Sequence, residues 1–217
     1  TSFLRSSRDH FPRVILGGAG IDLSIIAYLG NVQLIQNIIS KFPNAVSTLL
    51  YSQIASSNNP LEDKKSFIFV IKITTVVIFL VILLATIFSD LLVSILFGDQ
   101  YIPLIEVLKI ALPSMVLPCI GIVIIGYLTG KGDFTGPIYF ELFACIPLIV
   151  LIFNNEVFFS GKALGWFIFS SNIMFGIISI IYIKQLYKFK LFEFIIKKSD
   201  LKETYLIFKN LKKKYLF

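Results

Sequence analysis

Residues 76–87 read VVIFLVILLATI and contain no charged side chain. Residues 166–183 read WFIFSSNIMFGIISIIYI and are also free of charge. About 20 apolar residues in a helix cross the ~30 Å hydrocarbon core of a bilayer. Over the whole chain 56% of the residues are hydrophobic and the mean hydropathy is +0.85, values above those of a soluble domain. The sequence therefore predicts an integral membrane protein.

Five membrane-spanning helices are expected when these two runs are extended and the rest of the chain is searched in the same way. The expected spans are 28–54, 67–96, 102–129, 134–153 and 163–187. The breaks between them are polar and too short to hold a soluble catalytic domain. The expected fold is therefore all-α, a polytopic transmembrane helix bundle over residues 28–187. Residues 1–27 are expected to form the end of a preceding helix and an outer turn.

Residues 188–217 form a basic tail after the last expected span. Ten lysines lie between residues 184 and 214, and basic residues that flank spans favour the cytoplasm, so the C-terminus is expected there. The apolar residues of the tail fall on one side of a helix: Leu201, Tyr205, Phe208, Leu211 and Tyr215. Such an amphipathic basic segment is expected to rest on anionic lipid, with a disordered, solvated tail as the alternative. The net charge of +7 thus indicates membrane lipid rather than nucleic acid as a partner.

A stripe of polar residues runs along the first expected span. Its members at helical spacing are Gln33, Gln36, Asn37, Ser40, Lys41, Asn44, Ser47 and Thr48. A lysine near the middle of a membrane helix costs ~2.5–3.5 kcal/mol on insertion scales and usually faces a cavity, a partner or a substrate. We therefore predict that Lys41 and its polar neighbours line a water-filled cavity. The alternative is that the stripe joins helices by hydrogen bonds across their interface.

Other polar residues and helix breakers inside the spans give further expectations. Glu141 could exchange a proton or bind Na⁺, or it could accept hydrogen bonds from a neighbouring helix. Glu106 and Lys109 are three residues apart and are expected to pair with each other. Pro113 and Pro118 predict a bending element in the third span.

Signatures of enzymes, metal sites and cofactor sites are missing from the sequence. His10 is the lone histidine, which excludes a histidine-rich metal site, and the glycines at 17, 18 and 20 do not match a dinucleotide fingerprint. Cys119 and Cys145 both fall inside expected spans, where they are read as small buried hydrophobes without a disulfide. We therefore expect no catalytic residue, no metal and no cofactor.

Short motifs in a characteristic order run along residues 12–187. They are AY at 27–28, FPNAV at 42–46, YSQIAS at 51–56, LFGDQY at 96–101, LTGKG at 128–132 and GKALG at 161–165. Their order resembles the C-terminal half of a Wzx-type polysaccharide flippase, in the superfamily that also contains MATE exporters and lipid II flippases. The resemblance implies one lobe of a two-lobed transporter, with the N-terminal lobe of the same polypeptide as a partner. The chain also begins at Thr1 without Met, so we expect a fragment.

The resemblance implies transport of an oligosaccharide carried on undecaprenyl diphosphate across the bacterial cytoplasmic (inner) membrane, by alternating access through a cationic cavity. The product would be a surface polysaccharide such as O-antigen, and a polysaccharide polymerase complex is an expected partner. The cations expected to face the diphosphate are Lys41, Arg5, Arg8 and Arg13. The amides expected to bind sugar hydroxyls are Gln33, Gln36, Asn37 and Asn44, while Glu141 would couple an ion.

Two other function classes stay open. A MATE-like multidrug or cation antiporter would share the fold but should use acidic cavity residues, whereas the stripe is basic. A non-transporting membrane scaffold of a polysaccharide assembly complex would tolerate replacement of Lys41 by Leu. A membrane enzyme would be expected to show a large outer loop or clustered catalytic residues, and neither is present in the sequence.

Overall fold

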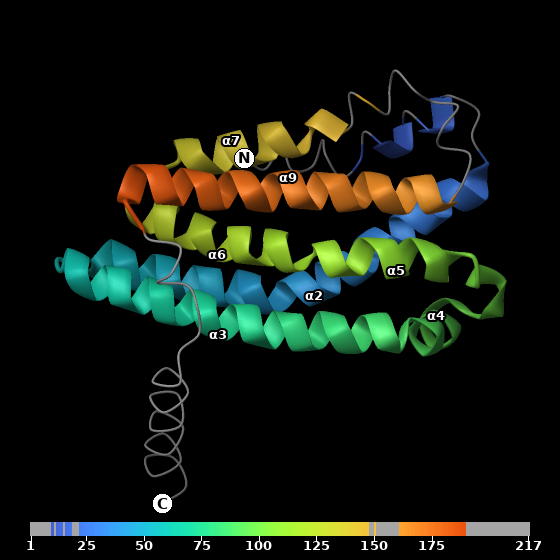
Figure 1. Cartoon of the computed structure of the whole chain (residues 1–217), viewed down its shortest axis with the longest axis horizontal. Helices are drawn as coiled ribbons and strands as arrows, with labels where there is room; N and C mark the ends of the chain where they lie inside the picture. The colour runs from blue at the N-terminus through green and yellow to red at the C-terminus, as the bar shows by residue number, and fades with distance from the viewer. Residues whose placement is uncertain are drawn as a thin grey trace, which may run out of the picture.

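The computed structural model describes residues 10, 12–14, 16–18, 22–147, 150 and 161–189, which form helices and turns and no strand. The elements are α2 (Leu23–Ser56), α3 (Pro60–Ile87), α4 (Ser89–Phe97), the short 3-10 helix η1 (Asp99–Tyr101), α5 (Leu104–Ser114), α6 (Val116–Gly130), α7 (Thr135–Ala144) and α9 (Gly161–Tyr187). In Figure 1 the longer helices run along one common direction, and α4 is seen nearly end-on. The predicted all-α class is confirmed for the described part of the chain.

Three of the described helices are long and apolar enough to cross a membrane, namely α2, α3 and α9. Together, α5 and α6 could form a fourth span, bent by 44° at the break between them. The five predicted spans are not confirmed. Of the predicted span 134–153 the structure describes α7, which has 10 residues and is too short to cross alone. Residues 148–149 and 151–153 lie outside the described part of the chain.

The predicted ends of the first two spans differ from the observed ones because local caps set the helix boundaries. Asp22 accepts a hydrogen bond from the Ser24 backbone N–H at 3.0 Å, so α2 begins at Leu23 rather than at residue 28. Asn59 caps α3 in the same way, accepting from the Leu61 N–H at 3.2 Å. The predicted span 67–96 is wrong at both ends, because α3 starts at Pro60 and stops at Ile87, and α4 is a separate helix.

The bend predicted from the prolines of the third span is confirmed at the junction of α5 and α6. Pro118 has no N–H, so the Ser114 carbonyl receives no helical hydrogen bond from it. The Met115 N–H instead donates to the Leu112 carbonyl at 3.0 Å, which tightens the last turn of α5. Asn172 of α9 donates through Nδ2 to Ser114 Oγ at 2.9 Å, so α9 braces the break.

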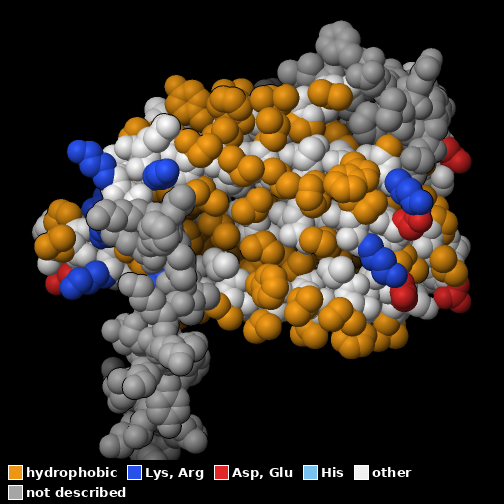
Figure 2. Space-filling model, in the orientation of Figure 1, with side chains coloured by type: hydrophobic (Ala, Val, Ile, Leu, Met, Phe, Trp, Pro, Cys, Tyr) orange, Lys and Arg blue, Asp and Glu red, His pale blue; other side chains and the backbone are white. Residues whose placement is uncertain are grey.

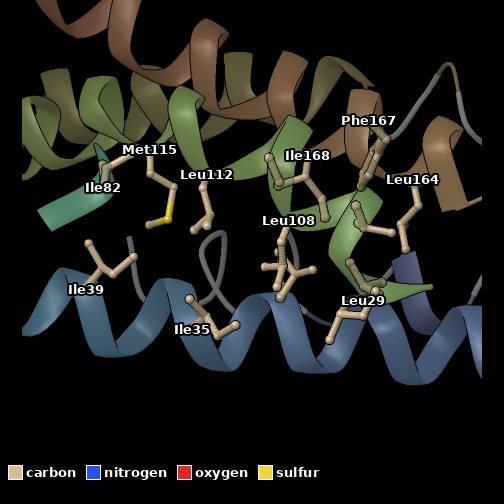
Figure 3. Packing of buried hydrophobic residues seen from close by; sticks show 14 of the residues in the cluster. Leu29, Ile35, Ile39, Ile82, Leu108, Leu112, Met115, Leu164, Phe167 and Ile168 are labelled. Atoms are coloured by element: carbon tan, nitrogen blue, oxygen red, sulfur yellow. The ribbon is translucent and has the colours of Figure 1, made fainter. Parts of the chain in front are cut away.

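The buried apolar residues form two clusters along the bundle. In Figure 3, Leu29 and Ile35 of α2 point toward Leu108 and Leu112 of α5, in the cluster that α9 completes. The second cluster includes Leu50, Phe67, Val123, Tyr127, Phe140 and Phe175. Lipid tails are as apolar as these side chains, so close packing rather than the hydrophobic effect must favour helix association.

Glycines allow that close packing at two contacts of α6. A Cβ on Gly126 would lie 2.5 Å from the carbonyl oxygen of Ser47 in α2. A Cβ on Gly176 of α9 would lie 2.9 Å from the carbonyl carbon of Leu117 in α6. Real Cβ atoms do not approach other atoms this closely, so α2, α6 and α9 can be this near only with glycine at these positions.

Charged side chains gather at the two ends of the bundle. Figure 2 shows hydrophobic side chains over the middle of the visible face, mostly basic side chains at one end, and basic side chains beside several acidic ones at the other. At the second end Lys109 pairs with Asp90 at 3.1 Å and Lys162 pairs with Glu106 at 3.3 Å. The predicted pairing of Glu106 with Lys109 is therefore wrong, because α5 contacts both α4 and α9, and each neighbour supplies a partner.

Candidate functional site

A cavity of about 160 Å³ lies beside the break between α5 and α6. Its lining comes from the segment before α2 and from α2, α6, α7 and α9, and contains His10, Arg13, Gln33, Gln36, Asn37, Ser40, Met115, Pro118, Ile122, Ile125, Glu141, Asn172 and Phe175. A single water needs roughly 10–15 Å³ by this kind of measure. The cavity can therefore hold several waters or a small polar part of a larger ligand.

The first half of the polar stripe on α2 forms one wall of the cavity. Gln33, Gln36, Asn37 and Ser40 recur every three or four residues and share a helix face, while Ile35 and Ile39 on the opposite face are buried in the core. Asn37 is exposed although it lines the cavity. The cavity therefore opens at the outer face of α2.

The second half of the stripe does not line this cavity. Asn44 Nδ2 donates to the Ser40 carbonyl of its own helix at 2.7 Å, and Ser47 Oγ donates to the Ile122 carbonyl of α6 at 2.8 Å. Ser47 thus fits the alternative prediction that stripe residues join helices by hydrogen bonds, because it links α2 to α6. Thr48 is exposed and donates to the Asn44 carbonyl at 3.0 Å.

Lys41 lies outside the cavity lining and is exposed. Successive residues of a helix are about 100° apart, so Lys41 is turned well away from Ser40, which faces the cavity. Lys41 instead shares the outer face of α2 with Ile38, which is also exposed. A role for Lys41 in binding stays a prediction, and it applies to this outer face.

Arg13 supplies the positive charge inside the cavity. Its Nη2 donates to Gln33 Oε1, and its guanidinium lies against Gly30, where a Cβ would be 3.7 Å from Nη2. The Arg13 Nε and the Gln36 Nε2 are both buried and have no hydrogen-bond partner among the described residues. A buried donor without a partner costs ~1–3 kcal/mol, so these two groups favour an occupant with acceptor oxygens.

Glu141 brings an ionisable carboxyl group to the same cavity. It lies on α7 and is only 5% exposed. An ionisable residue buried inside a membrane bundle is costly and commonly marks a functional site. The sequence did not indicate that Glu141 and Arg13 would share a cavity, because they are far apart along the chain.

Two of the polar lining residues, His10 and Asn172, were assigned no cavity role from the sequence. The clearer case is Asn172. It lies in the middle of α9, within the uncharged run 166–183 that served only to identify a span. The signal that could have found it is the polar triplet Ser170–Ser171–Asn172, the most polar part of that run. Ser171 Oγ donates to the Ala144 carbonyl of α7 at 2.8 Å, so the triplet both joins helices and lines the cavity.

Arg5, Arg8 and the tail from residue 190 onward lie outside the described residues, so their predicted roles stay predictions. Comparison of the chain with protein-family models, curated proteins and solved structures finds no match.

Proposed function

We propose that this chain is part of a membrane transporter that moves an oligosaccharide linked to undecaprenyl diphosphate across the bacterial cytoplasmic membrane. The observation that carries the proposal is the polar cavity formed by Arg13, Gln33, Gln36 and Asn172 beside a broken helix, inside an otherwise apolar bundle. Transporter sites are commonly built at discontinuous helices, where backbone and side chains can contact a polar cargo.

The outer face of α2 supports a cargo that is both polar and lipidic. Ile38, Phe42 and Leu49 are exposed there next to the exposed Lys41 and Thr48. A face that only met lipid would be uniformly apolar, as on the exposed side of α3 between Phe79 and Ile87. A lipid-linked sugar matches a mixed face, because its hydrocarbon chain can follow the apolar residues while its head reaches the cavity.

Charge in and near the cavity supports a diphosphate group. Arg13 lies inside the cavity, and Lys41 lies on the face where the cavity opens. A diphosphate in a low-dielectric site needs paired cations, whereas sugar hydroxyls need neutral donors and acceptors such as Gln33, Gln36 and Asn37. The arrangement offers both kinds of group within reach of one ligand.

Lysines at one end of the bundle support a cytoplasmic C-terminus. Lys64 and Lys65 in the first turns of α3, Lys131 after α6 and Lys184 near the end of α9 belong to this end. Basic residues that flank spans favour the cytoplasm. By this argument the end where α9 finishes faces the cytoplasm.

A MATE-like cation antiporter is the second candidate, and Glu141 is the observation that favours it. A buried carboxylate in the cavity could bind a cation or exchange a proton. Replacement of Glu141 by Gln separates the two candidates when binding of the cargo is measured rather than transport. An antiporter would lose binding of its cation cargo, whereas a diphosphate site would still bind its cargo through Arg13 and would lose only the ion coupling.

The test of the proposal uses a strain in which the gene is deleted. Lipid-linked oligosaccharide is quantified in each membrane leaflet, with complementation by wild type, Arg13→Gln, Lys41→Ala and the control Lys65→Ala. Lys65 is exposed and belongs to α3, which contributes no residue to the cavity lining, so its replacement removes a positive charge without changing the lining. We expect accumulation in the cytoplasmic leaflet that wild type and Lys65→Ala relieve and Arg13→Gln does not.

Unchanged lipid-linked oligosaccharide after deletion would overturn the flippase proposal and favour the antiporter. Reduced surface polysaccharide with unchanged leaflet distribution, together with full activity of Arg13→Gln and Lys41→Ala, would indicate a scaffold instead.

A further inference from the structure

Helix α4 lies where α3 would leave the membrane. With 28 residues, α3 is ~42 Å long, which covers the hydrocarbon core and both headgroup layers of ~40–45 Å in total. The chain turns at Phe88, and α4 then runs across the direction of α3, as its end-on view in Figure 1 shows. The turn therefore falls at headgroup level, at the end opposite the lysine-rich end.

Three different faces run along α4. The first is buried against the bundle through Ser89 and Val93, which are 0% and 1% exposed. The second is polar, with Asp90 paired to Lys109 at 3.1 Å and Ser94 donating to Asp99 at 2.9 Å. The third is apolar and exposed, and consists of Phe88, Leu91 and Ile95, with exposures of 52%, 57% and 72%.

The polar face and the apolar face together limit how deeply α4 can lie in the bilayer. Asp90 is two-thirds exposed and cannot lie in hydrocarbon without a large cost. The N–H groups of the first turn of α4 have no partners within the helix, so they also need water or headgroups. Leu91 and Ile95 would instead be left in water if α4 lay above the bilayer.

We propose that α4 is an interfacial helix that lies in the plane of the bilayer surface, with Leu91 and Ile95 inserted at the boundary between headgroups and acyl chains. Leu84 and Ile87 near the end of α3 are exposed and apolar as well, at helical spacing before Leu91. Lipid that covers this part of α3 would therefore cover Leu91 and Ile95 as well. Lys109 pairs with Asp90 and Lys162 pairs with Glu106 at this end, so these four described residues supply no excess of positive charge that would draw α4 to anionic lipid. Apolar insertion is what holds the helix there.

The experiment places an environment-sensitive fluorophore at single cysteines in the full chain, reconstituted in phosphatidylcholine vesicles. Leu91→Cys and Ile95→Cys test the apolar face, and Ser94→Cys on the polar face is the matched control. The natural cysteines are replaced by Cys119→Ala and Cys145→Ala. Should that background fail to fold, the same three variants are made in the natural chain and the signal of labelled wild type is subtracted.

We expect quenchers carried on lipid chains near the headgroups to quench the probes at 91 and 95, and aqueous iodide to quench the probe at 94. Iodide quenching at 91 and 95 should be about tenfold weaker than at 94, because iodide is charged and excluded from the acyl region. Added anionic lipid should leave this pattern unchanged. Equal iodide quenching at all three positions would overturn the proposal. Protection of 91 and 95 from both quenchers would overturn it too, and would indicate that a second copy or another protein covers this face.

Discussion

The two halves of the polar stripe on α2 carry the same kinds of side chain but have different uses. From Gln33 to Ser40 the stripe faces a cavity, whereas Ser47 lies against α6 and donates to the Ile122 carbonyl at 2.8 Å. The difference comes from α6. At its start Pro118 and the break after Ser114 leave space, while further along Gly126 lets the two backbones come together. A polar stripe in a membrane helix thus takes its role from the helix that faces it.

We call Gln33 to Ser40 the cavity half of the stripe and Asn44 to Thr48 its packing half. Gly126→Leu should disrupt the contact between the packing half and α6, and it should have the largest effect. A side chain at 126 would collide with Ser47, whose carbonyl oxygen is 2.5 Å from the site of the new Cβ. Overpacking costs ~1–3 kcal/mol, and a collision with backbone lies at or above the top of that range. We expect a large drop in the thermal unfolding midpoint in detergent, followed by circular dichroism.

Gly18→Leu is the matched control for this substitution, because no described residue lies within 4 Å of the Cβ that it would add. The unfolding midpoint of this variant should stay close to that of wild type. Equal destabilisation by the two substitutions would show that α2 and α6 do not depend on their close contact at Gly126.

Gln36→Leu should change the cavity half without weakening the fold. Gln36 Nε2 is buried and has no hydrogen-bond partner among the described residues, so its removal loses no bond within this part of the protein. If it binds the cargo, loss of one hydrogen bond of ~1.4 kcal/mol lowers transport about tenfold. The measurement is the amount of lipid-linked oligosaccharide that reaches the outer leaflet.

Asn44→Leu serves as the control for Gln36→Leu, since Asn44 lies on the same helix but bonds to the Ser40 carbonyl rather than lining the cavity. Transport should be near that of wild type. Similar losses in the two variants would contradict the division of the stripe into a cavity half and a packing half.

Ser47→Ala should give the converse result, with lower stability and unchanged transport. It removes the hydrogen bond to the Ile122 carbonyl, and such bonds between membrane helices average ~0.6 kcal/mol. Thr48→Ala is the control, because the Thr48 hydroxyl bonds only to its own helix. Chemical unfolding of the two variants in the same detergent would show whether the Ser47 hydroxyl, unlike the Thr48 hydroxyl, stabilises the contact between α2 and α6. A transport defect in Ser47→Ala with unchanged stability would contradict this assignment.

Local sequence was sufficient to predict the all-α class, the bend at Pro113 and Pro118 and the polar face of α2, but not the number of spans or their ends. Each of the predicted features depends on neighbouring residues, through apolar length, a missing N–H or helical spacing. The end of α3 at Ile87 was missed because no proline or glycine marks the turn and the apolar run resumes at Leu91, although Ser89 and Asp90 follow the turn directly.

Only one wall of the cavity could be predicted in this way, because Gln33, Gln36, Asn37 and Ser40 share the expected polar face of α2, whereas the grouping of the other polar lining residues could not. Arg13, Glu141 and Asn172 come from three separate parts of the chain and meet only after the helices pack. Lys41 was the strongest candidate by charge, yet its angular position on α2 turns it outward, which depends on which side of α2 meets α6. Helical spacing fixes a face, but only the partner helix decides whether that face lines a cavity.

Acid should affect the cavity half before the packing half, through Asp133 in the turn between α6 and α7. Asp133 accepts hydrogen bonds from the Thr135 and Gly136 N–H groups at 3.1 and 3.2 Å, and from Tyr182 Oη at 2.9 Å. Burial by itself would raise the pKa of Asp133, but these hydrogen bonds outweigh it and hold the pKa below its usual value of 3.8. A lowered pKa means that the stability from Asp133 is present above about pH 4 and is lost as pH falls through the folded-state pKa.

Asp133→Asn keeps the capping oxygen but loses the charge, so it should lower the free energy of unfolding by only ~0.5–1.5 kcal/mol at pH 7. Because the amide does not titrate, the variant should also lose less stability than wild type below pH 4. Because Asp133 holds the start of α7, which carries Glu141, a probe on α7 should respond to acid before a probe on α2 near Ser47. Hydrogen exchange of the two helices between pH 3 and pH 6 measures this order. Simultaneous opening of α7 and the α2–α6 contact would mean that the cavity wall and the packed contact form one cooperative unit. The two halves of the stripe would then differ in role but not in local stability.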